Sequence, residues 1–150
     1  MEPEHIAPCG MNCSLCISYQ FGEKDLNKKG FRRSYCLGCI ARGKHCTHMG
    51  NRCSSMATGE FRFCFECPKY PCSSLKNLDK RYRTKYHMSM LENLDFIKNW
   101  GITRFLRAQE AQWKCSSCED LICCHNGLCL NCQQDVFLQN KKYRWNEEQK

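Results

Sequence analysis

Cysteine spacing constrains this chain more than any other feature of its sequence. Of the 150 residues, 16 are cysteine, and most of these fall in close pairs or triplets. The groups are Cys9/Cys13/Cys16, Cys36/Cys39, Cys64/Cys67 with Cys72, Cys115/Cys118 and Cys129/Cys132. A CxxC turn directs two thiolates at one centre, as tetrahedral zinc or an iron–sulfur cluster requires, whereas disulfides generally join more widely spaced cysteines. The spacing therefore predicts a metal-binding protein.

A secreted, disulfide-stapled scaffold is the main alternative, because just over a tenth of the residues are cysteine. The first residues, MEPEH, are polar and acidic, whereas a signal peptide needs a basic start followed by an apolar stretch. No apolar run reaches the length of a membrane span. We therefore expect a cytoplasmic protein with reduced thiols and no membrane partner.

Hydrophobic residues are few once the cysteines are set aside. Without the 16 cysteines, the hydrophobic share falls from 42% to about a third of the chain, which is lean for a globular core. Valine occurs only as Val136, so the β-branched residues that fill extended sheets are scarce. We expect a small metal-organised α+β fold with an irregular cysteine-rich knuckle module, an α-helical hairpin, a C-terminal zinc ribbon and no large sheet.

The formal net charge of +8 suggests a polyanionic partner, but this charge counts every cysteine as neutral. Metal ligation requires thiolates, and a zinc ion with four thiolates carries a net charge of about −2. Three such sites would lower the +8 to about +2, and four would lower it to about zero. Net basicity is therefore weak support for nucleic-acid binding.

Four segments differ in cysteine content and in apolar periodicity. Residues 1–74 are predicted to form a cysteine-rich metal-binding module, 75–112 a helical hairpin, 113–134 a zinc-ribbon-like unit and 135–150 a polar tail whose aromatic residues dock. A short helix is also expected after Cys16.

The cysteine-free segment carries conventional helix signals. Ser89 and Glu92 have the spacing of a capping box, and Gly101 stands where a left-handed C-terminal cap belongs. A second helix is predicted to start near Thr103, so the two helices form an αα-hairpin with its turn around Gly101.

Two CxxC pairs near the C-terminus, ten residues apart, form the most specific motif. Asn126-Gly127 favours a type I′ turn, which would pair residues 121–125 with 128–130 and bring both pairs onto one zinc ion. The predicted ligands are Cys115, Cys118, Cys129 and Cys132. Three residues are left over, and they either pack under the hairpin or act as swapped ligands or free thiols: Cys123, Cys124 and His125.

Ten cysteines in the N-terminal segment divide into two four-ligand sites with two to spare. We predict that Cys13/Cys16 join Cys36/Cys39, and that Cys64/Cys67 join Cys46 and Cys53. Cys9 and Cys72 then remain as spare thiols or swapped ligands.

The CxxxCxxC spacing of Cys9, Cys13 and Cys16 offers an alternative to zinc. Radical S-adenosylmethionine enzymes hold a [4Fe–4S] cluster with this spacing, but they need a barrel of roughly 200 residues rich in Val and Ile. The chain is too short and too poor in both residues for such a barrel. A cluster on these three cysteines, completed by a remote one such as Cys72, stays open.

A basic segment interleaved with aromatic residues is a weak candidate for nucleic-acid contact: Arg81, Tyr82, Arg83, Lys85 and Tyr86. The alternative is a solvated basic linker with its tyrosines packed beneath it. No catalytic motif stands out in the sequence, so we do not expect an enzyme.

The ordered motifs resemble a family. Motifs that carry the resemblance are APCGMNCSLC at 7–16, CLGC at 36–39, CFEC at 64–67, YPC at 70–72 and RYRTKY at 81–86. Together they resemble DUF3795, a cysteine-rich prokaryotic family of unknown function. The resemblance implies a cytoplasmic prokaryotic protein and supports metal binding, but it supplies no activity. His87 departs from the pattern, which would have glycine there.

We therefore expect a cytoplasmic protein that binds two to four zinc ions and acts by binding an unidentified protein or nucleic acid. An iron–sulfur or thiol redox protein with a [4Fe–4S] cluster on Cys9, Cys13 and Cys16 is the first alternative. A metal delivery or storage protein is the second.

Overall fold

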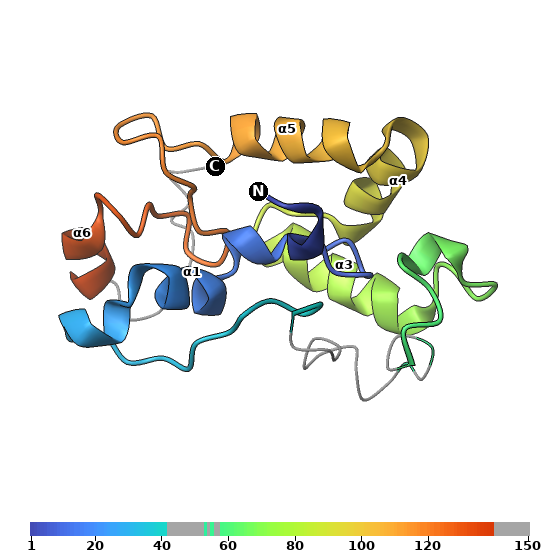
Figure 1. The fold of residues 1–150 in the computed structure, drawn as a ribbon, viewed down its shortest axis with the longest axis horizontal. Helices are drawn as coiled ribbons and strands as arrows, with labels where there is room; N and C mark the ends of the chain where they lie inside the picture. Colours follow the sequence, from blue (N-terminus) through green and yellow to red (C-terminus); the bar gives the residue numbers. More distant parts are fainter. Residues whose placement is uncertain (42–52, 54, 56–57, 140–150) are drawn as a thin grey trace.

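The computed structural model describes residues 1–41, 53, 55 and 58–139 (Figure 1). The elements in these ranges are all helical: η1 (Pro3–His5), η2 (Cys13–Leu15), α1 (Ile17–Lys24), η3 (Leu26–Lys29), η4 (Cys64–Glu66), α3 (Ser73–Lys85), α4 (Met90–Trp100), α5 (Ile102–Gln112) and α6 (Gln134–Gln139). Extended pairing in this part of the chain is limited to two isolated bridges, Ile6–Asn12 and Lys114–Leu121. The fold is mostly helical without a sheet, so the β component of the predicted α+β fold is not found there.

Helices α4 and α5 follow one another at Gly101 and lie along one edge of the molecule (Figure 1). The segment 75–112, predicted to be a hairpin of two helices, also contains most of a third helix, α3. Ser89 is the N-cap of α4, and its side chain accepts a hydrogen bond from the backbone N–H of Glu92 at 3.1 Å. Gly101 joins the helices with a positive φ of 85°, but its ψ of 161° is extended, so the cap is not the left-handed one predicted.

The basic segment predicted as a linker is the last part of α3. Asp79 on this helix is buried and accepts hydrogen bonds from the Ser89 hydroxyl at 2.6 Å and from the Leu91 backbone N–H at 3.1 Å. These bonds fix the start of α4 against α3. The turn between the helices passes through His87, whose φ of 53° is left-handed. Glycine adopts that conformation without strain, whereas a residue with a Cβ does not.

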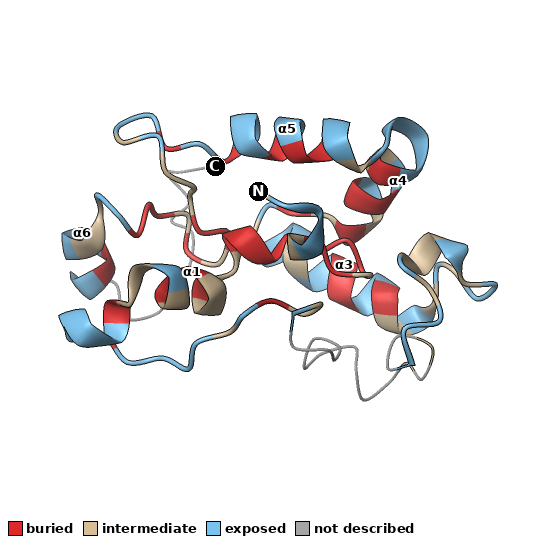
Figure 2. Cartoon of the chain, in the orientation of Figure 1, coloured by how far each residue is buried: buried red, intermediate tan, exposed pale blue. Residues whose placement is uncertain are grey.

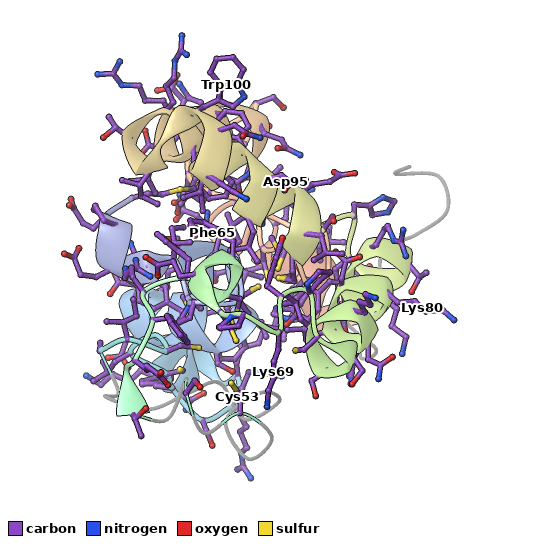
Figure 3. The ribbon with its side chains drawn as sticks, turned by 90° about the vertical axis from the view of Figure 1, so that its right-hand side faces the viewer. Cys53, Phe65, Lys69, Lys80, Asp95 and Trp100 are labelled. Carbon is purple, nitrogen blue, oxygen red and sulfur yellow. The ribbon has the colours of Figure 1, made fainter. Side chains whose placement is uncertain are left out.

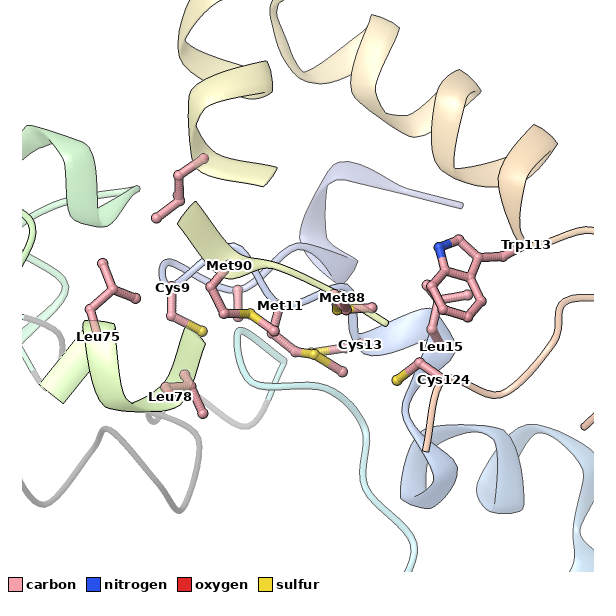
Figure 4. Packing of buried hydrophobic residues seen from close by; sticks show 12 residues of the cluster. Cys9, Met11, Cys13, Leu15, Leu75, Leu78, Met88, Met90, Trp113 and Cys124 are labelled. Atoms are coloured by element: carbon pink, nitrogen blue, oxygen red, sulfur yellow. The ribbon is translucent and has the colours of Figure 1, made fainter. Parts of the chain in front are cut away.

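The largest core cluster is rich in sulfur and lies where the N-terminal loops meet α3 and α4 (Figures 2 and 4). Its buried sulfur residues are Cys9, Met11, Cys13, Met88, Met90 and Cys124. Gly10 sits so close to α4 that a Cβ there would lie 2.8 Å from the Met90 carbonyl oxygen, and its own carbonyl accepts from Asn93 Nδ2 at 2.9 Å. The cysteine-rich loop is therefore part of the core.

A second core cluster joins α1 and η3 to the C-terminal residues. Phe137 of α6 is buried and its ring lies 5.7 Å from Phe21 and 5.0 Å from Phe31, between ring centroids. Docking of this aromatic residue agrees with the prediction for the tail, whereas Tyr143 and Trp145 lie outside the described residues. In the part of the chain that the structure describes, no helix is long and apolar enough to cross a membrane.

Candidate metal centres

Four cysteines from the two C-terminal CxxC pairs come together at one point, and we call them the C-terminal cysteine group: Cys115, Cys118, Cys129 and Cys132. All four sulfur atoms lie within 4.8 Å of one another. Cys115 Sγ is 3.7 Å from Cys132 Sγ, and Cys118 Sγ is 3.4 Å from Cys129 Sγ. A tetrahedral zinc ion with Zn–S bonds near 2.3 Å needs sulfur atoms about 3.8 Å apart. The predicted set is therefore assembled with the spacing of one four-coordinate ion.

Hydrogen bonds from backbone N–H groups shape both turns of the C-terminal cysteine group. The Cys115 N–H donates to the Asp120 carbonyl at 2.7 Å, and the Glu119 N–H donates to the Cys115 carbonyl at 2.9 Å. In the second turn, the Cys129 N–H donates to Gln133 Oε1 at 2.9 Å. These bonds hold the cysteine side chains on one side of each turn, so the ligands are preorganised.

The surroundings of the four sulfur atoms lower the pKa of some of these thiols and raise the pKa of others. Backbone N–H groups of Cys118 and Ser117 lower the pKa of Cys115 to about 6, and the Asp120 N–H lowers the pKa of Cys118. The neighbouring Cys115 sulfur raises the pKa of Cys132 to about 12. Four thiolates this close repel one another unless a cation lies between them, so the group is suited to a metal ion.

The loop between the two CxxC pairs differs from the predicted hairpin. The Cys123 N–H donates to the Leu128 carbonyl at 2.9 Å, and the Gly127 N–H donates to the Cys123 carbonyl at 2.9 Å. Gly127 has a positive φ of 71°, but Asn126 does not share it, and a type I′ turn needs positive φ at both residues. The predicted turn type is therefore wrong, and residues 124–127 form a four-residue loop.

The two leftover cysteines are buried in the two core clusters. Cys123 packs in the second core cluster, with residues of α1 and η3. Cys124 packs in the largest, sulfur-rich core cluster, and its N–H donates to the Leu15 carbonyl at 2.9 Å. Burial raises the pKa of Cys123 to about 12 and raises that of Cys124 as well. Both therefore behave as apolar thiols that join the C-terminal segment to the N-terminal one.

His125 does not face the C-terminal cysteine group but lies against α1 and α3. Its Nδ1 accepts from the Ile17 N–H at 3.1 Å, so the ring proton is assigned to Nε2, which lies 3.0 Å from the Tyr82 hydroxyl. The rings of Tyr82 and Tyr86 pack edge-on against the imidazole. Burial lowers the pKa of His125 to about 4, so the ring is neutral at pH 7.

Five N-terminal cysteines line one cavity of about 360 Å³, which we call the N-terminal cavity: Cys9, Cys13, Cys16, Cys36 and Cys39. A Cβ on Gly38, whose φ is 101°, would lie 3.7 Å from Cys13 Cβ, so the Cys36–Cys39 turn is next to Cys13. The Gly38 N–H also donates to Cys36 Sγ at 3.4 Å. The two pairs predicted to share a site thus surround one space, and ligation itself stays a prediction.

The other predicted N-terminal site corresponds to a pocket of about 40 Å³ that four cysteines line: Cys53, Cys64, Cys67 and Cys72. Apolar side chains such as Phe61, Phe63 and Tyr70 line the rest of it. Figure 3 labels Cys53 close to Lys69, which lines the same pocket. Cys72, predicted to be spare or swapped, is near three predicted ligands, while Cys46 lies outside the described residues.

Sulfur spacing separates these N-terminal groups from the C-terminal one. Among residues 1–41, 53, 55 and 58–139, one group of three or more possible metal ligands has all of its ligand atoms within 4.8 Å of one another, and it is the C-terminal cysteine group. The cysteines around the N-terminal cavity share a cavity wall but do not converge on a single-ion position.

The basic–aromatic segment presents its charges outward and its rings inward. Arg81, Arg83 and Lys85 are exposed, whereas Tyr82 and Tyr86 are partly buried against His125. The exposed charges and packed tyrosines agree with the alternative of a solvated basic linker, but the segment is the end of helix α3 and not a linker. Contact with nucleic acid stays a prediction. Sequence patterns could not reveal the wall that Tyr82 and His125 form, because these residues lie 43 positions apart.

Comparison with known proteins identifies a family model that matches about the first half of the chain. A family model described as "Protein of unknown function (DUF3795)" matches residues 5–77, which include the N-terminal cysteines. No curated protein and no solved structure matches the chain significantly.

Proposed function

We propose a function from the chain's own residues, because the DUF3795 model that matches residues 5–77 is described as a protein of unknown function. We propose that the protein is a zinc-binding protein in which the C-terminal cysteine group holds one structural zinc ion. The observation that carries this proposal is the convergence of four sulfur atoms within 4.8 Å from two CxxC turns.

The donor set supports a structural role for the ion. Four thiolates complete a tetrahedral zinc site and leave no coordination position for water or substrate, whereas catalytic zinc sites keep one position open. Backbone N–H groups around Cys115 and Cys118 stabilise the thiolate forms that zinc requires.

Zinc at this position would hold the C-terminal segment against the N-terminal one. Lys24 at the end of α1 forms an ion pair with Asp120 at 3.1 Å, inside the stretch between the two CxxC pairs. Further along the same loop, Cys124 and His125 contact the backbone of Leu15 and Ile17. Zinc in the CxxC turns would therefore support a loop that also packs on the N-terminal segment through the buried Cys124. The binding of a macromolecule, or delivery of metal, stays a prediction beyond this role.

Metal analysis of the full chain and of two matched variants tests the proposal. Cys115→Ala should remove about one equivalent of zinc, whereas Ser116→Ala, which changes an exposed residue next to that ligand, should retain the wild-type zinc content. Cobalt added to apoprotein should give the visible absorption of tetrahedral cobalt–thiolate coordination, and Cys115→Ala should reduce it. Equal zinc content in Cys115→Ala and wild-type protein would contradict the proposal.

A further inference from the structure

The N-terminal cavity is too large for a single ion. Five cysteines line its volume of about 360 Å³, which is roughly ten times the volume that one water molecule occupies in the liquid. A single zinc ion needs four sulfurs about 3.8 Å apart, a spacing that the C-terminal cysteine group approaches, with its sulfurs all within 4.8 Å of one another. The cavity therefore has room for a polynuclear group.

The distances between the sulfur atoms around the cavity also favour a polynuclear group over a single ion. Among the described residues, its cysteines do not form a set of three sulfurs within 4.8 Å, although the C-terminal cysteine group does. A cubane cluster places a separate iron at each thiolate, so its ligands stand further apart than the sulfurs around one zinc ion. Thiolates distributed around an open space match the cluster.

The backbone supplies the hydrogen bonds that such ligands need. The Gly38 N–H donates to Cys36 Sγ at 3.4 Å. Burial raises the pKa of the Cys16 thiol, and the backbone N–H groups of Tyr19 and Ser18 offset only part of this effect. Hydrogen bonds to cysteine sulfur stabilise thiolates and tune the potential of a bound cluster.

Charged and aromatic residues complete the walls. Arg33 and Arg81 line the cavity, and two cationic side chains match the two negative charges that four thiolates leave on a [4Fe–4S]²⁺ cluster. Tyr82, Tyr86 and the neutral His125 form an aromatic wall. Charge does not distinguish a cluster from zinc, because four thiolates with either one carry a net charge of about −2. The volume of the cavity and the spacing of its sulfur atoms make the distinction.

We propose that the N-terminal cavity binds one [4Fe–4S] cluster through Cys13, Cys16, Cys36 and Cys39. This centre is additional to the C-terminal zinc ion. Cys9, the most buried cysteine of the cavity, lines the α3 side and is assigned no iron.

Anaerobic reconstitution of the full chain tests this assignment. Equal amounts of ferrous and ferric iron with four equivalents of sulfide supply the atoms and electrons of a [4Fe–4S]²⁺ cluster, and dithionite then reduces it by one electron. We expect about four iron and four sulfide per chain, broad visible absorption that air bleaches, and an EPR signal after reduction. Tight binding of zinc in the cavity with no iron retained would overturn the proposal.

Two matched variants identify the ligands. Cys36→Ala and Cys67→Ala each remove one half-buried cysteine of a CxxC pair, the first in the N-terminal cavity and the second in the other pocket. Cys36→Ala should lose most of the iron and the EPR signal, and Cys67→Ala should keep both, with equal far-UV circular dichroism. Loss of the cluster in Cys67→Ala, or its retention in Cys36→Ala, would overturn the ligand assignment.

A further variant separates this inference from the proposed zinc site. Cys118→Ala should lose zinc from the C-terminal cysteine group yet still take up the cluster under the same conditions. Cluster uptake without C-terminal zinc in the wild-type protein would refute only the zinc proposal, and zinc without a cluster would refute only this inference.

Discussion

The C-terminal cysteine group and the N-terminal cavity use the same residue type in different ways. In the first, two CxxC turns separated by ten residues bring four sulfurs within 4.8 Å of one another. In the second, cysteines from 9–16 and 36–39 surround about 360 Å³, and helix α1 lies between them in the sequence. Short connections therefore produce a compact single-ion geometry, whereas cysteines carried by separate loops enclose a volume.

The two regions also depend differently on the apolar core. Cys9 and Cys13 belong to the sulfur-rich core cluster, so the wall of the cavity is continuous with the packing of α3 and α4 (Figure 4). In the C-terminal cysteine group, Cys132 is exposed and Cys118 is half-buried, while Cys115 and Cys129 are buried but, like the other two, belong to none of the three core clusters. We therefore expect metal to control the order of the C-terminal turns, while packing controls the shape of the cavity.

Complete removal of metal gives the largest expected effect and tests this difference. Structural zinc contributes apparent binding free energies of about 10 kcal/mol or more, comparable with the whole stability of a small domain. Excess chelator should therefore lower the melting temperature steeply. Hydrogen exchange should show protection lost first at residues 113–134 and last in α4 and α5. Equal loss of protection in both regions would remove the distinction.

Removing an aromatic ring from the second core cluster gives the next largest effect. Phe137→Ala should destabilise the protein by about 3–5 kcal/mol, because the buried ring packs against Phe21 and Phe31. Val136→Ala, at a neighbouring exposed position of α6, should cost about 0.5 kcal/mol or less and serves as the control. Denaturant titration measures both. If Phe137→Ala also releases zinc, the C-terminal turns depend on the core more than their exposure suggests.

Local signals in the sequence predicted the parts of the fold that short segments determine. The cap at Ser89, the turn at Gly101 and the convergence of Cys115 to Cys132 all follow from residues close together in the chain. The type I′ turn failed for a local reason as well: the Asn126 side chain accepts from the Leu128 N–H at 3.0 Å, which stabilises a different loop.

Long-range packing accounts for what the sequence did not predict. Cysteine is both a metal ligand and a buried apolar residue, so spacing could not show that Cys9 and Cys124 share a core with Met88 and Met90. His125 was grouped with the zinc ribbon because it lies between the CxxC pairs. Its partners, Ile17 and Tyr82, are 108 and 43 positions away, and no sequence periodicity connects them.

Acid should weaken the wall between the two regions through His125. Burial lowers its pKa in the folded protein to about 4, and the nearby Arg33 and Arg81 act in the same direction, whereas an unfolded histidine titrates near 6.5. As the pH falls, the histidine is therefore protonated in the unfolded state before it is protonated in the folded state. This histidine's contribution, on the order of 2 kcal/mol, is therefore complete above about pH 6.5 and is lost as the pH falls towards 4.

A titration of stability against pH isolates this contribution from acid release of metal. His125→Gln keeps an N–H donor near Tyr82 but does not titrate, so the stability difference between wild type and variant should shrink as the pH falls from 7 towards 4. A difference that stays constant over this range would show that the imidazole is not held neutral.

The smallest expected effect concerns a position that touches neither cysteine group. His87 adopts a left-handed φ of 53° in the turn between α3, which lines the cavity, and α4. This conformation costs a residue with a Cβ about 1–2 kcal/mol, and glycine avoids that cost. Glycine also makes the unfolded chain more flexible, which offsets part of the gain in stability. His87→Gly should therefore stabilise the protein by about 0.5–1 kcal/mol. Lys85→Gly, within α3, should instead destabilise it by about 1 kcal/mol.

Both variants should keep the wild-type metal content, because the turn positions the helices without contributing a ligand. A change in zinc or iron content in His87→Gly would show that the α3–α4 turn, and not the cysteine loops alone, determines the geometry of the N-terminal cavity.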